Sequence, residues 1–116
     1  MQEIDKIYSN EIGISFYWNT PAHDFIDKVQ LIFRDIGFLL TLAELKSFAS
    51  ACSTTYTTSN CRNCRLGNDC RNLLLKTPSN KIDIAISLNE LDQVSSLLDA
   101  TILKVELRSW INSSYN

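Results

Sequence analysis

The sequence lacks the motifs that common forms of catalysis need. It contains one histidine, three glycines and two prolines in 116 residues. Neither a G-x-S-x-G nucleophile motif nor a glycine-rich phosphate loop occurs. The carboxylates Asp24, Asp27 and Asp35 are scattered and form no readable acid–base pair. The sequence therefore favours a protein that is not an enzyme.

Long apolar runs and a leader sequence are also missing. A membrane-spanning helix needs about 20 apolar residues in a row, and the longest runs here are a few residues. The start, MQEIDKIYSNEIG, has no basic end, no apolar run and no small-residue cleavage site. We expect a cytoplasmic protein without membrane contact, in a compartment that keeps thiols reduced. The net charge of −2 and the pI of about 5.3 argue against a general nucleic-acid binder, whose surface is usually basic.

All the cysteines of the chain lie in one short segment: Cys52, Cys61, Cys64 and Cys70. Clustered cysteines with a C-x-x-C pair are typical of metal binding or redox chemistry. In a glycine-containing turn, Cys61 and Cys64 can direct two thiolates at one Zn²⁺, with Cys70 as a third ligand. Cys52 is the obvious fourth. The sequence thus predicts a structural zinc site at these four residues.

A second interpretation of Cys52 is open. It continues an apolar helical stripe with Leu45 and Phe48, and a free cysteine behaves as a small buried apolar residue. If Cys52 belongs to the core, then His23, Asp69 or water must complete the zinc site. Other uses of the loop cysteines also stay open. The alternatives are that the cysteines stay free thiols, that Cys61 forms a disulfide with Cys64 or Cys70, that they hold an iron–sulfur cluster, or that they form a redox pair.

Three arginines accompany the loop cysteines: Arg62, Arg65 and Arg71. Their guanidinium groups can offset the negative charge of a zinc–thiolate centre and donate to its sulfur atoms. The alternative is a contact with an anion or a nucleic-acid backbone. Residues 61–70 contain no aromatic side chain on which a base could stack.

Two capping boxes, 46 residues apart, predict where the helices begin. In each box, Thr41 with Glu44 and Ser87 with Glu90, a hydroxyl and a carboxylate satisfy backbone N–H groups at the start of a helix. Two apolar runs separated by a turn precede each box. The pattern predicts a hairpin followed by a helix, twice, and suggests a tandem ββα repeat. The same offset pairs Cys52 with Leu98.

The remaining segments complete an α+β fold. Strands are expected at residues 4–8, 12–18, 29–33, 38–40, 73–75 and 84–86, and loops at residues 19–27 and 53–72. Residues 102–112 fit either a strand with a short helix or a continuous helix from Asn89, and residues 113–116 are expected to fray. We predict one α+β domain over residues 1–116, with antiparallel hairpins and two helices on one face.

A pattern in the second half of the chain resembles that of known proteins. After the hairpin and the capping box comes Glu90-Leu91-x-x-Val94-x-x-Leu97-Leu98-x-Ala100. This arrangement is similar to that of a family of small uncharacterised bacterial α+β proteins, over roughly residues 8–110. The resemblance implies an α+β fold and a bacterial source, and it supplies no site residue and no function.

The sequence as a whole predicts a small non-enzymatic interaction or structural module, stabilised by zinc, with a protein partner that the sequence does not identify. The first alternative is a thiol-redox or iron–sulfur protein that uses Cys61 and Cys64. The second is a nucleic-acid or anion contact through Arg62, Arg65 and Arg71.

Overall fold

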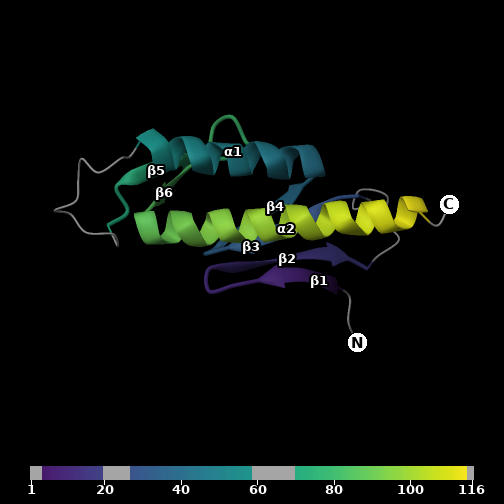
Figure 1. Cartoon of the computed structure of the whole chain (residues 1–116). Coiled ribbons are helices and arrows are strands. Elements are labelled where there is room, and N and C mark those ends of the chain that lie inside the picture. Colours follow the sequence, from purple (N-terminus) through teal and green to yellow (C-terminus); the bar gives the residue numbers. More distant parts are fainter. Residues whose placement is uncertain (1–3, 20–26, 59–69, 115–116) are drawn as a thin grey trace.

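The computed structural model describes residues 4–19, 27–58 and 70–114 (Figure 1). In chain order the elements are β1 (Ile4–Ser9), β2 (Gly13–Trp18), β3 (Val29–Phe33), β4 (Ile36–Leu40), α1 (Leu42–Thr58), β5 (Leu73–Lys76), β6 (Asp83–Ile86) and α2 (Leu88–Ser114). The predicted α+β class is confirmed. The expected loop at residues 19–27 lies mostly outside the described residues.

The first four strands form an antiparallel sheet in the order β1-β2-β3-β4. In β3 the side chains alternate between buried and half-buried, with Val29, Leu31 and Phe33 pointing into the core. That alternation is the signature of a strand with one covered face. A two-residue turn, Arg34-Asp35, joins β3 to β4, so the expected four-residue turn was too long.

The last two strands pair only with each other among the described residues and form a separate two-stranded sheet. A side chain connects the two sheets, because Arg34 Nη1 donates to the carbonyl oxygen of Ala85 in β6 at 2.6 Å. The element order β3-β4-α1 and β5-β6-α2 agrees with the arrangement of a tandem repeat. A duplication of the chain itself stays a prediction.

Both helices begin where the capping boxes place them. The backbone N–H of Glu44 donates to Thr41 Oγ1 at 3.2 Å, and the N–H of Thr41 donates to Glu44 Oε1 at 2.9 Å. The corresponding distances between Ser87 and Glu90 are 3.1 and 3.0 Å. Each box therefore satisfies two of the N–H groups that a helix start leaves unpaired.

Helix α1 is longer than the sequence suggested. Residues 53–58 were expected to start a loop that runs to residue 72, but they continue the helix to Thr58. Threonine side chains support this last part, because Thr57 Oγ1 donates to the Ser53 carbonyl and Thr58 Oγ1 donates to the Thr54 carbonyl, at 2.9 and 3.0 Å. Residues 59–69 lie outside the described part of the chain.

Helix α2 is continuous to Ser114, so of the two alternatives for residues 102–112 the continuous helix is confirmed. The expected fraying was wrong for residues 113 and 114, which are helical, while residues 115 and 116 are not described. The helix is held along β1 and β2. Thr101 Oγ1 lies 2.6 Å from Ser15 Oγ, and Arg108 stacks over the Tyr17 ring at 4.3 Å and pairs with Asp5.

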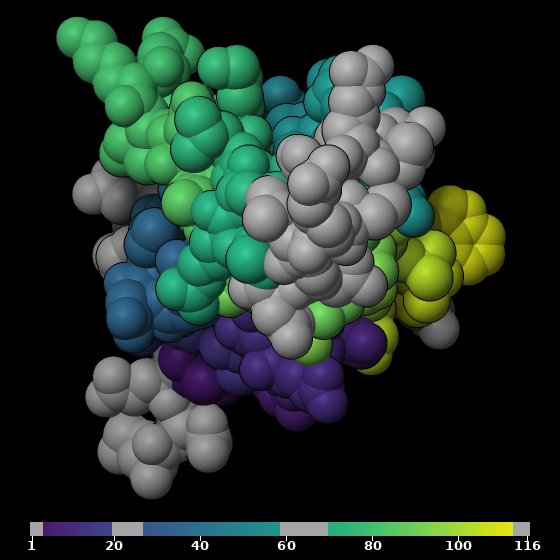
Figure 2. All heavy atoms as spheres, turned by 90° about the vertical axis from the view of Figure 1, so that its left-hand side faces the viewer, coloured from purple at the N-terminus to yellow at the C-terminus, as the bar shows by residue number. Residues whose placement is uncertain are grey.

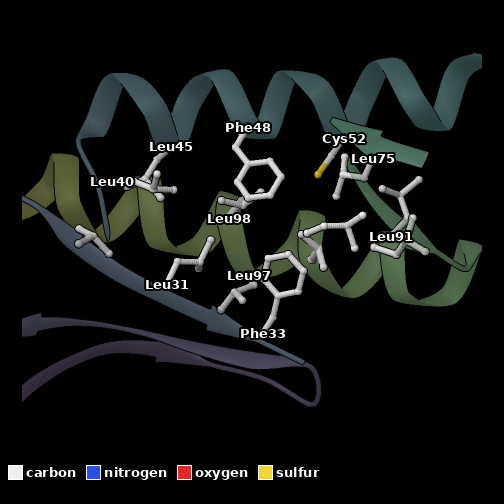
Figure 3. Close-up of a cluster of buried hydrophobic side chains, with 14 of the residues drawn as sticks. Leu31, Phe33, Leu40, Leu45, Phe48, Cys52, Leu75, Leu91, Leu97 and Leu98 are labelled. Atoms are coloured by element: carbon white, nitrogen blue, oxygen red, sulfur yellow. The ribbon is translucent and has the colours of Figure 1, made fainter. Parts of the chain in front are cut away.

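The core lies between the four-stranded sheet, the β5–β6 hairpin and the two antiparallel helices (Figures 1 and 3). From α1, Leu45, Phe48 and Cys52 point toward α2, whose Leu91 and Leu98 point back (Figure 3). Leu97 lies on the sheet side of α2, beside Phe33 (Figure 3). The ring of Phe48 packs near those of Phe33 and Phe38, at centroid distances of 6.1 and 5.4 Å. Among the described residues, no helix has the length and apolar character to cross a membrane.

Candidate functional site

The structure describes two of the four predicted zinc ligands, and they have different environments. Cys52 lies in α1 with 1% of its surface exposed, and its sulfur points into the core (Figure 3). Cys70 is exposed and precedes β5. Cys52 is a free thiol. Cys61 and Cys64 lie outside the described residues.

Burial disfavours the ionised, thiolate form of Cys52. Desolvation, followed by the negative charge of Asp99, raises the pKa of the Cys52 thiol to about 12. The thiol is therefore neutral at pH 7, whereas a zinc ligand must be a thiolate. Leu98, the residue paired with Cys52 by the 46-residue offset, is also fully buried. These observations favour the core interpretation of Cys52.

The zinc site itself stays a prediction, because two of its four predicted ligands are not described. Cys61, Cys64, His23 and Asp69 fall in the undescribed segments, as do Arg62 and Arg65. Within the described ranges, no group of three His, Cys, Asp or Glu side chains could hold a metal ion.

Arg71, the described member of the predicted arginine group, is bound to a carboxylate. Its Nη2 lies 2.7 Å from Glu90 Oε2, and its Nε lies 3.0 Å from Glu90 Oε1. Such a two-pronged pair uses the fork of donors that would otherwise hold a phosphate. Arg34 approaches the same carboxylate, with Nη1 at 3.9 Å from Oε1. The pairing weakens the case for an anion contact through Arg71.

The sequence pattern predicted only the capping role of Glu90. It did not predict the pair of Glu90 with Arg71, which lie 19 positions apart in the chain. Two acceptor roles meet in one carboxylate, because Glu90 caps α2 and binds Arg71. Hydrogen bonds from Arg71, aided by the Ser87 backbone N–H and the charge of Arg34, hold the pKa of Glu90 at about 2, although partial burial opposes them. The usual value is 4.5.

Glu90 should make stability depend on pH in the acid range. Its pKa is lower in the folded than in the unfolded chain, so the unfolded chain binds the proton more tightly. The stabilisation is present above about pH 4.5 and is lost as the pH falls toward 2. We expect Tm to fall across this window, and Glu90→Gln to remove part of that fall. Circular dichroism melts between pH 2 and 7 measure both.

The matched control is Glu44→Gln at the start of α1. Glu44 makes the same capping bonds to Thr41, and the arginine pair is what distinguishes Glu90. The control should keep most of the wild-type fall in Tm. If both substitutions reduced the fall of Tm with pH equally, then capping, rather than the pair with Arg71, would be what lowers the pKa of Glu90.

The second half of α2 exposes a row of large apolar side chains, here called the α2 stripe. Its members are Leu103, Leu107, Trp110 and Ile111, which are 65, 52, 66 and 41% exposed. On the first half of the helix, the same outward face carries Asp92, Ser96 and Asp99. The helix surface therefore changes from polar to apolar along its length, on the side opposite the buried Leu98 and Thr101.

The position of α2 in the fold explains this exposure. Lys46, in the second turn of α1, pairs with Glu106 at 2.7 Å, and α1 begins one turn earlier, at Leu42. Near the C-terminal end of α2, Arg108 contacts Asp5 of β1. The last turns of α2 therefore extend beyond the N-terminal end of α1 (Figure 1). In Figure 2 the yellow C-terminal atoms of α2 project from the outline of the molecule.

Sequence reasoning missed the α2 stripe because it left the tail undecided between strand and helix. The signal was present, since Leu103, Leu107 and Trp110 have helical spacing. A helix assignment alone would not have shown that this face is outward. That required knowing which faces of α2 the sheet and α1 cover.

A groove with a partly apolar lining lies between α1 and β5. Its walls carry many hydroxyl groups, from Ser47, Ser50, Thr54, Thr55, Thr58 and Thr77, and its apolar lining includes Phe48, Leu74 and Pro78. The Thr58 hydroxyl already donates to carbonyls of its own helix.

Comparisons with protein-family models, with curated proteins and with solved structures found no significant match to this chain. They do not test the similarity to a bacterial family over roughly residues 8–110, which stays a prediction. The site must therefore be interpreted from the residues themselves.

Proposed function

We propose that this chain is a non-enzymatic protein-interaction module whose contact surface is the α2 stripe. The observation that carries the proposal is the exposure of Leu103 and Leu107 on a helix whose outward face is polar over its first half. Burying a leucine side chain that is now in water would contribute about 1.5–3 kcal/mol. A contiguous apolar patch on an ordered helix is a typical protein contact surface.

The scaffold suits this role because the stripe lies on a rigid element. Helix α2 is tied to the β1–β2 hairpin at both ends of their contact, through Asn10 Nδ2 to the Gln93 carbonyl at 2.9 Å and through Asp5 to Arg108 at 3.1 Å. A surface held in one conformation loses little entropy when a partner binds. The stripe can therefore use most of its burial free energy for affinity.

A structural zinc ion remains part of the proposal. The C-x-x-C pair Cys61 and Cys64, with Cys70 nearby in sequence, supports it. The role of the ion would be to order the loop between α1 and β5. A cytoplasmic location belongs to the same proposal, since thiolate ligands need a reducing compartment. Elemental analysis of the purified chain tests for the metal.

Site-specific photo-crosslinking in cells tests the proposed contact surface. A photoreactive amino acid replaces Leu107 in the α2 stripe, and the same amino acid replaces Leu74, which is 63% exposed on β5, as the matched control. We expect a discrete covalent adduct from position 107 that position 74 does not give. Absence of an adduct at 107, or equal adducts at both positions, would overturn the proposal.

A further inference from the structure

The partner of the α2 stripe can be inferred from its own spacing and charges. Ala100, Leu103, Leu107 and Trp110 follow one another at intervals of three, four and three residues. That alternation is the a/d repeat by which two helices pack side by side, with each side chain inserted between those of the facing helix. We propose that the occupant is a second copy of this chain, which packs α2 against α2 in parallel about a two-fold axis. This inference rests on the proposed contact surface.

The buried face of α2 leaves room for this arrangement. The residues that pack on the chain's own core, including Val94, Leu98 and Thr101, lie on the side of the helix opposite Leu103 and Leu107. In each copy, α2 would lie between the core of that copy and the two-fold axis. The four-stranded sheets of the two copies would therefore be on opposite, outer sides of the dimer. The bodies of the two copies therefore do not compete for the space at the stripe.

The charges that flank the stripe favour the parallel orientation. Asp99 and Lys104 are both exposed and lie on opposite sides of the a/d row. In a parallel pair, two flanking residues that are five positions apart, as Asp99 and Lys104 are, face each other across the interface. Asp99 of one copy therefore meets Lys104 of the other, and the two-fold axis repeats the pair. An antiparallel pair would instead group Asp99 with Glu106 on one side and the two Lys104 side chains on the other. Like charges in those positions repel.

The size of the patch sets the expected strength. The four stripe side chains present on the order of 400 Å² in each copy, a size that ordinary monomers also show. Two copies would bury roughly twice that area, which is below the about 1,200 Å² of stable complexes. The dimer is therefore weak, with a dissociation constant on the order of 10–100 μM.

Sedimentation velocity of the full chain, from about 5 to 500 μM, measures the self-association. We expect the weight-average sedimentation coefficient to rise with concentration. Leu103→Glu should raise the dissociation constant at least about tenfold, because each dimer receives two buried carboxylates. Leu74→Glu removes an equally exposed leucine outside the stripe, so it should change the constant by less than about twofold. Circular dichroism confirms that each variant is folded.

Charge reversal tests the orientation. Asp99→Lys and Lys104→Asp should each weaken the dimer about fivefold, and the double variant should regain most of that loss, since the pairs re-form with exchanged signs. Failure of the double variant to recover would overturn the parallel arrangement. A monomer at every concentration, or a dimer indifferent to Leu103→Glu, would overturn the inference as a whole. In that case an adduct from position 107 to another protein would leave the proposed contact surface standing, and no adduct would remove both.

Discussion

Replacing Phe48 with alanine is expected to lower the free energy of unfolding by about 3–5 kcal/mol, the usual range for losing a buried aromatic ring. Phe48 is 1% exposed and projects from the middle of α1 into the space between the helices and the sheet (Figure 3). Its ring packs near Phe33 and Phe38, which come from the two strands of one hairpin. The substitution would leave a cavity where three elements meet, and rigid neighbours cannot fill it.

Urea unfolding followed by circular dichroism measures this loss. A domain of this size has a total stability of roughly 5–15 kcal/mol, so the variant should unfold at a much lower urea concentration. Phe48→Leu is the graded control, since it keeps much of the side-chain volume and should cost clearly less. A loss below about 1 kcal/mol for Phe48→Ala would show that the ring is not part of a packed core.

Replacing Cys52 with alanine is expected to cost about 1–2 kcal/mol and to leave the zinc content of the chain unchanged. The first part follows from removing a small buried side chain, whose sulfur contacts the core between α1 and α2. The second part follows from burial, which keeps the thiol neutral at pH 7. Urea unfolding and elemental analysis of the same preparation measure the two effects.

Cys70→Ala is the matched control for the metal, because Cys70 is exposed and is itself a predicted ligand of the loop site. It should lower the zinc content while costing little in the fold of the metal-free chain. If Cys52→Ala also removed the metal, then the four-cysteine site would be right and the core interpretation wrong. A wild-type chain free of zinc would remove the zinc part of the proposed function and leave the stability prediction intact.

The positions of the helix starts and, within two residues, of the strands could be predicted from sequence because local patterns decide them. In the capping boxes, both partners lie within four residues, so Thr41 with Glu44 and Ser87 with Glu90 fix the first helical residues without help from the fold. Alternation likewise gave β3 its correct bounds at residues 29–33. The helix ends could not be predicted in the same way. Serine- and threonine-rich residues 53–58 have weak helix propensity and were taken for a loop.

Long-range packing decided the features on which the candidate site depends. Cys52 has the same local sequence whether it is a ligand or a core residue, and only the approach of α2 from the other half of the chain buries it. The pair of Arg71 with Glu90 forms because β5 and β6 bring the two residues together before α2 begins. No short-range rule of spacing contains either contact.

The α2 stripe shows the division between sequence and tertiary structure most directly. The sequence by itself determined that apolar side chains recur with helical spacing from Leu103 to Trp110, and that the helix could begin at Ser87. It did not determine which of two apolar faces would be covered. The tertiary structure decided this, because α1 and the β1–β2 hairpin can cover one side of α2 and not the other. The side left in water is the one we propose for the contact between copies.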